Sequence, residues 1–88
     1  MTIEQQLEKT IDELLKSAKY KSSDEQSKRD MIGEEIYSYI ESKSSQDDAG
    51  KITGMIIDLP IDALETSVKT IISLNEKISE GKQLLAED

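Results

Sequence analysis

The apolar residues of this chain recur at spacings of three and four through almost its whole length, which is the pattern of amphipathic helices. In the first segment Ile3, Leu7, Ile11 and Leu14 fall on one face. The chain has a single proline, and no stretch alternates apolar and polar residues as a half-buried strand does. The sequence therefore predicts an all-α fold, a small right-handed superhelix or bundle of about five helices joined by short links.

The chain divides into two predicted parts, which together form one compact domain. Residues 1–22 are expected to be an amino-terminal amphipathic helix, capped by Thr2 and reaching to about Lys19, followed by a linker. Residues 23–88 hold the remaining helices, and Glu87 and Asp88 should fray. These helices are expected over residues 24–42 with Ser22 or Ser23 as the cap, over 48–58, over a short segment with Pro60 in its first turn, and from a capping box at Ser73–Glu76 onward.

The composition excludes several classes of function. The chain has no Cys and no His, and its 11 basic residues against 19 acidic ones give a net charge of −8. Without thiolate or imidazole we expect no enzyme, no catalytic residues, no bound metal and no cofactor. Direct nucleic-acid binding needs the opposite charge balance, and no apolar run is long enough to span a membrane. The composition predicts a soluble, cytoplasmic, acidic helical module that works by binding.

Three glycines stand inside predicted helices, where each destabilises the helix by roughly 1 kcal/mol relative to Ala. Gly33, Gly54 and Gly81 can each be explained in two ways, as a site of close helix packing or as an opening for a ligand. Gly33 precedes Tyr37 by four residues, so the missing side chain lies on the same helix face as the ring, one turn away. This arrangement suits a slot for an incoming aromatic group.

Three blocks of the sequence carry a resemblance to a known family. The run Gly50–Asp58, GKITGMIID, resembles the KITGMLLE signature of the MLLE domain, the carboxy-terminal peptide-binding module of cytoplasmic poly(A)-binding proteins. Met31–Tyr37 and Ser73–Glu80 are similar to the family's segments on the preceding and the last helix. The resemblance implies a small right-handed helical superhelix that binds short disordered motifs with a key Leu and a key Phe.

The resemblance also implies two pockets. The Phe of the ligand would enter between the second and third predicted helices, where Gly33 leaves room for it and Tyr37 stacks on it. The Leu would enter between the third and fifth, against Met55 and Gly81. The full set of residues that the resemblance assigns to peptide binding is Asp30, Gly33, Glu34, Tyr37, Gly50, Lys51, Thr53, Gly54, Met55, Ile56, Asp58, Gly81 and Leu84.

The predicted function is thus a non-enzymatic adaptor, a monomer whose partners are short disordered peptide motifs in translation and mRNA-decay factors. One alternative keeps the module and changes the parent protein to a HECT-type ubiquitin ligase or a fungal endosomal mRNA-transport protein. Another alternative is a structural helical module that dimerises through Ile3–Lys19.

Overall fold

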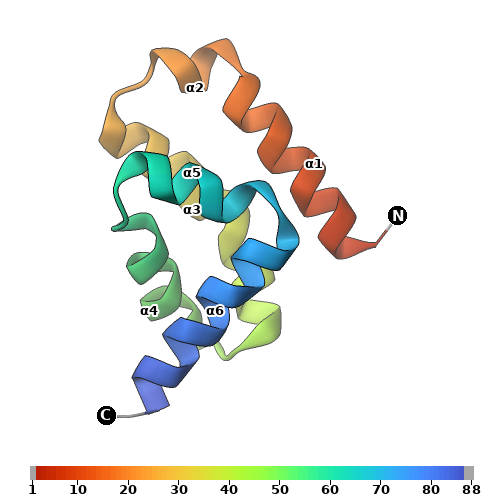
Figure 1. Ribbon diagram of the computed structural model, residues 1–88, viewed down its shortest axis with the longest axis vertical. Helices are drawn as coiled ribbons and strands as arrows, with labels where there is room; N and C mark the ends of the chain where they lie inside the picture. Colours follow the sequence, from red (N-terminus) through yellow and green to blue (C-terminus); the bar gives the residue numbers. More distant parts are fainter. Residues whose placement is uncertain (1, 87–88) are drawn as a thin grey trace.

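The computed structural model describes residues 2–86, and all of its regular structure is helical (Figure 1). The all-α prediction is confirmed, with six helices in the described residues in place of the expected five. They are α1 (Ile3–Lys16), α2 (Ala18–Ser22), α3 (Glu25–Lys43), α4 (Gln46–Ile57), α5 (Ile61–Lys69) and α6 (Ile71–Ala86). The expected fraying of Glu87 and Asp88 lies outside the described residues.

The extra helix, α2, corrects the predicted linker. The first helix ends at Lys16 and not at Lys19, because the Ser17 hydroxyl accepts the backbone N–H of Tyr20 at 3.1 Å and starts a new turn. Tyr20 is only 2% exposed, and its hydroxyl donates to the Glu65 carboxylate on α5 at 2.6 Å. Burial, with the nearby Glu65, raises the pKa of Tyr20 above its ordinary value. The segment is therefore a helical turn that carries a core residue.

The first two predicted caps have different outcomes. Thr2 and Gln5 form a capping box at the start of α1, which confirms the predicted cap. The cap of α3 is Asp24, which accepts the N–H of Ser27 at 2.8 Å, so the prediction of Ser22 or Ser23 is wrong. Those two hydroxyls donate to the Lys19 carbonyl in α2, and neither accepts an N–H of α3. Hydrogen bonds from Ser27 lower the pKa of Asp24.

The last two helices also begin elsewhere than predicted. Pro60 is the residue before α5 and not part of its first turn. Helix α6 begins at Ile71, so the predicted capping box at Ser73–Glu76 is wrong. The Thr70 hydroxyl accepts the N–H of Ser73 at 3.2 Å, and the Glu8 carboxylate on α1 accepts the N–H of Ile71 at 2.7 Å. A cap supplied by a distant helix cannot be read from local spacing.

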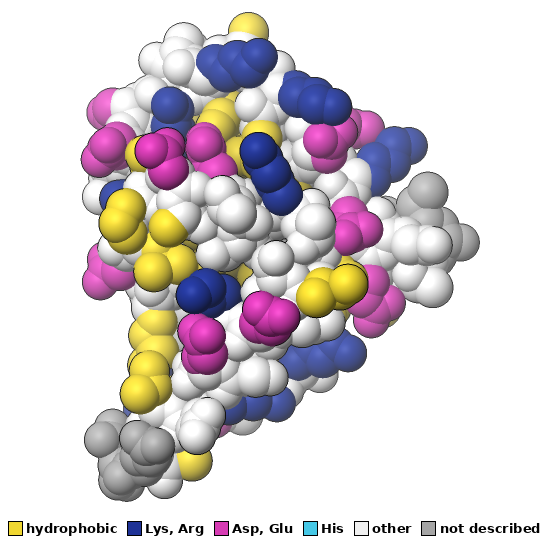
Figure 2. Space-filling model, in the orientation of Figure 1, with side chains coloured by type: hydrophobic (Ala, Val, Ile, Leu, Met, Phe, Trp, Pro, Cys, Tyr) yellow, Lys and Arg dark blue, Asp and Glu magenta, His cyan; other side chains and the backbone are white. Residues whose placement is uncertain are grey.

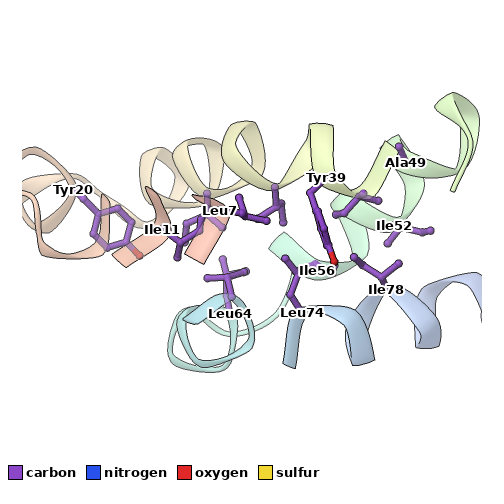
Figure 3. Packing of buried hydrophobic residues seen from close by; sticks show 14 residues of the cluster. Leu7, Ile11, Tyr20, Tyr39, Ala49, Ile52, Ile56, Leu64, Leu74 and Ile78 are labelled. Carbon is purple, nitrogen blue, oxygen red and sulfur yellow. The ribbon is translucent and has the colours of Figure 1, made fainter. Parts of the chain in front are cut away.

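The hydrophobic core is formed by all six helices, with α3 packed against both α1 and α4 (Figure 3). Helix α1 also contacts α5 and α6, and Ile11 on its apolar face is fully buried. The Tyr39 ring extends from α3 across the core, and its hydroxyl donates to Asn75 Oδ1 on α6 at 2.6 Å. The buried apolar residues are Leu7, Ile11, Tyr20, Ile32, Ile36, Tyr39, Ile40, Ala49, Ile52, Ile56, Leu64, Val68, Leu74 and Ile78.

Candidate functional site

Helix α4 has α3 on one side and α6 on the other, and the surface is hollowed along both seams. The α3/α4 hollow has a volume of about 400 Å³. The α4/α6 hollow is smaller, with a volume of about 160 Å³. The run from Gly50 to Asp58 that the sequence singles out therefore forms most of the helix that separates the two hollows.

The α3/α4 hollow opens where a side chain is missing. Its lining residues are Asp30, Gly33, Glu34, Tyr37, Thr53 and Ile57. A Cβ placed on Gly33 would lie 3.6 Å from Ile57 Cγ2 and 3.8 Å from Thr53 Cγ2, which is ordinary van der Waals contact. Helix packing thus does not require glycine here. The absent side chain leaves open a space beside the half-buried Tyr37 ring.

The same hollow has an unpaired polar group in its wall. Thr53 is 7% exposed, and its Oγ1 has no hydrogen-bond partner among the described residues. A buried hydroxyl without a partner destabilises a fold by about 1–3 kcal/mol. This wall of the hollow is therefore less stable than a fully apolar one would be.

An arginine holds the end of α4 beside this hollow. Arg29 on α3 donates from its guanidinium to the backbone carbonyls of Ile57 and Leu59. A cation at a helix carboxyl terminus also interacts favourably with the helix dipole. The contact fixes the position of Ile57, which lines the hollow, and the sequence reading did not foresee it.

The α4/α6 hollow has exposed apolar edges. Its lining residues are Met55, Ile56, Leu59, Lys77, Glu80, Gly81 and Leu84. Met55 is 37% exposed and Leu84 is 56% exposed, which are high values for large apolar side chains. Lys77 and Glu80 form an ion pair at 3.4 Å on the α6 side. The result is a narrow apolar hollow with a charged margin.

Gly81 behaves differently from Gly33. A Cβ placed on Gly81 would lie only 3.2 Å from Cγ1 and Cγ2 of Ile52, and Ile52 is fully buried. At Gly54, by contrast, a Cβ would meet nothing within 4 Å. Close packing therefore explains Gly81, whereas Gly33 has room for a methyl group beside the wider hollow, and Gly54 faces open space but lines neither hollow.

The structure brings together most, but not all, of the residues assigned from the sequence. Asp30, Gly33, Glu34, Tyr37 and Thr53 line one hollow, and Met55, Ile56, Gly81 and Leu84 line the other. The remaining four, Gly50, Lys51, Gly54 and Asp58, line neither. Gly50, Lys51 and Asp58 are exposed on or beside α4.

The sequence reading missed four lining residues. These are Ile57, Leu59, Lys77 and Glu80. Ile57 could have been found from helical spacing, because it lies one turn after Thr53 and shares its face. Leu59 follows the end of α4, so no periodicity could have placed it.

A family model described as the MLLE domain matches residues 19–85 of the 88-residue chain. The chain belongs to the MLLE family. Both hollows lie within the matched residues, whereas α1 precedes them. MLLE domains are peptide-binding interaction modules and not a catalytic family. No solved structure matches the chain significantly.

Two further observations concern other kinds of site. Across residues 2–86, no helix has both the length and the apolar character that crossing a membrane requires. The same part of the chain contains no group of three or more acidic side chains placed to hold a metal ion.

Proposed function

We propose that the hollows on the two sides of α4 are two halves of one peptide-binding surface. A short motif places a Phe side chain in the α3/α4 hollow and a Leu side chain in the α4/α6 hollow. The observation that supports this most directly is the position of α4 between the hollows, since a peptide that fills both must cross this helix. The sizes agree with the assignment, because the wider hollow takes the larger side chain.

The two apolar anchors supply the main favourable free energy of the proposed binding. Burying a Phe or a Leu side chain contributes roughly 1.5–3 kcal/mol, and contact of Phe with the Tyr37 ring adds roughly 0.5–1.5 kcal/mol. Ordering a disordered peptide opposes these gains. The two anchors alone thus contribute less than the roughly 8 kcal/mol that a Kd of 1 μM requires, so the rest of the peptide must add further contacts for micromolar binding.

The charge of the chain favours basic peptides. Asp30 and Glu34 lie at the wider hollow and the net charge is −8, whereas Glu80 at the narrower hollow is paired with Lys77. Lys or Arg residues near the anchors would therefore speed association, and salt would weaken the effect.

The parent protein that we infer is a cytoplasmic poly(A)-binding protein, with partners among translation and mRNA-decay factors. The three-block resemblance supports this placement. RNA-recognition motifs in the same gene product would support it further, whereas a HECT ligase domain would contradict it. A dimerisation module built on α1 is not favoured, because Leu7 and Ile11 on its apolar face pack inside the molecule.

The test is a set of double-mutant cycles that combine two substitutions in the peptide with two substitutions in the protein. A fluorescent peptide that carries both anchors is titrated into wild type, Tyr37→Ala and Met55→Ala, and the titrations are repeated with the Phe or the Leu of the peptide replaced by Ala. We expect Tyr37→Ala to weaken the parent peptide about 30-fold, and Met55→Ala about fivefold. Each loss should nearly vanish when the matching anchor is already absent from the peptide.

Tyr37→Phe is the matched control, because it keeps the ring and should bind like wild type. Thermal melts of all variants are needed, since Tyr37 packs against the core. If the losses of binding free energy from the peptide change and from the protein change add in every combination, the Phe and Leu anchors do not contact Tyr37 and Met55.

A further inference from the structure

A third hollow, which is shallow and open, lies along the exposed face of α6. Its lining residues are all exposed residues of this one helix, Ile72, Asn75, Glu76, Ser79 and Glu80. Ile72 is 70% exposed, which is unusual for a large aliphatic side chain in so small a protein. Glu80 also lines the α4/α6 hollow, so the two hollows adjoin at this residue.

The side chains that connect the hollows form one line on α6. Ile72, Glu76, Glu80 and Leu84 are spaced by four residues, so each lies next to the one before and about 40° further around the axis, in a row that curves around the helix. Figure 2 shows acidic groups next to apolar groups on this face of the molecule, over α6. A ligand lying on this line meets an apolar contact, then negative charge, then a second apolar contact.

Some polar groups of the third hollow have no ion-pair or hydrogen-bond partner among the described residues. Glu80 pairs with Lys77, but no described residue forms an ion pair with Glu76. Carboxylates four residues apart on a helix repel each other slightly, and a cation placed between them relieves this repulsion. Asn75 uses its Oδ1 to accept the Tyr39 hydroxyl, which leaves its N–H donors for a peptide carbonyl.

We propose that this hollow is a third subsite, which binds the flank of the peptide on the side of its Leu anchor and selects a basic residue followed by an aliphatic one. The inference rests on the proposed function, because it takes the Leu anchor in the α4/α6 hollow as its starting point. Charge complementarity favours this occupant. A second copy of the chain, packed symmetrically on this face, would bring the carboxylates of Glu76 and Glu80 close to those of its partner.

The spacing of the flank follows from geometry. Glu80, which lines both hollows, and Ile72 are eight residues apart on α6, which corresponds to about 12 Å along the helix axis and about 80° around it. An extended peptide covers this distance in about four residues, and every second side chain faces the same way. The basic residue therefore stands second from the Leu anchor and faces Glu76 and Glu80, and the aliphatic residue stands fourth and contacts Ile72.

The experiment compares three fluorescent peptides on the intact chain. The core peptide carries only the Leu and Phe anchors, the extended peptide adds Lys at the second and Ile at the fourth flank position, and a third peptide has Glu in place of the Lys. The test variant is Ile72→Ser with Glu76→Gln. The matched control is Ile3→Ser with Glu41→Gln, which removes a similarly exposed Ile and one acidic charge from α1 and α3.

On wild type we expect the extended peptide to bind about tenfold more tightly than the core peptide, and the Glu peptide to gain less than about twofold. The test variant should lose the gain while its affinity for the core peptide is unchanged, and the control should keep it. Equal affinities of core and extended peptides on wild type would overturn the third subsite and leave the proposed function standing. Failure of every peptide to bind would instead overturn the proposed function. Self-association of wild type that Ile72→Ser abolishes would assign this face to a second copy and also overturn the inference.

Discussion

The two sides of α4 differ in how their glycines are used. On the α3 side, Gly33 faces Thr53 and Ile57 with room for a methyl group, and the hollow beside it is wide. On the α6 side, Gly81 lies directly against the buried Ile52, and the hollow beside it is narrow. The same residue type thus opens a space on one side of the helix and brings two helices together on the other.

The difference separates binding from stability. Filling an opened space removes room for the ligand and leaves the fold intact, whereas adding atoms to a packed contact pushes the helices apart. A substitution at Gly33 should therefore weaken ligand binding, whereas a substitution at Gly81 should lower the stability of the fold.

The largest expected effect is on the α6 side. Replacing Gly81 by Ala should lower the free energy of unfolding by about 2 kcal/mol, because the strain of the 3.2 Å contacts with Ile52 outweighs the gain in helix propensity. Urea unfolding followed by circular dichroism measures this change. The double variant with Ile52→Val should recover part of the loss, since it removes one methyl group from the contact. An unchanged or raised midpoint for Gly81→Ala would show that α6 shifts without strain.

On the α3 side we expect the opposite sign. Replacing Gly33 by Ala should raise the free energy of unfolding by about 0.5–1 kcal/mol and weaken a peptide carrying both anchors about tenfold. A thermal melt and a peptide titration on the same sample measure the two effects. Ser38→Ala on α3 is the matched control, because this exposed residue lines neither hollow beside α4. A Gly33→Ala variant that binds normally would place the Phe anchor elsewhere, and loss of stability would show a packing role.

The smallest predicted effect concerns the wall of the wider hollow. Thr53→Val replaces the unpaired hydroxyl by a methyl group of similar size and should raise the free energy of unfolding by about 1 kcal/mol. Thr66→Val on α5 serves as control, because the Thr66 hydroxyl donates to the Asp62 carbonyl and is exposed. Chemical denaturation of both variants makes the comparison. If Thr53→Val is less stable than wild type, the Thr53 hydroxyl has a hydrogen-bond partner in solution, and it does not weaken the wall of the hollow.

Local patterns predicted most of the helices correctly. The spacing of apolar residues placed α3 and α4 within two residues of their observed ends, because helical periodicity and capping are decided by neighbours in the chain. The cap at Thr2 is of the same kind, since its partner Gln5 is three residues away. The Glu8 cap of α6 could not be predicted from neighbouring residues, because Glu8 and Ile71 are 63 residues apart in the sequence.

Helix α2 was not predicted from the local sequence pattern. The sequence from Lys19 to Ser23 lacks an apolar repeat, and one buried ring decides its structure. Tyr20 is buried in the core, and its hydroxyl donates to Glu65 on α5, 45 residues away in the sequence. The sequence contains both residues but not their distance, so a linker was the natural prediction.

By itself, the sequence determined that the chain is helical, that it carries three MLLE-like blocks, and that Gly33 and Tyr37 share a face. These are properties of spacing and of residue type, and they do not depend on how the helices pack. Only the tertiary structure decided that Gly33 borders an open space, that Gly81 is pressed against Ile52, and that Leu59 closes one hollow. The reason is that a cavity or a contact exists between helices, and its size depends on side chains that are far apart in the sequence.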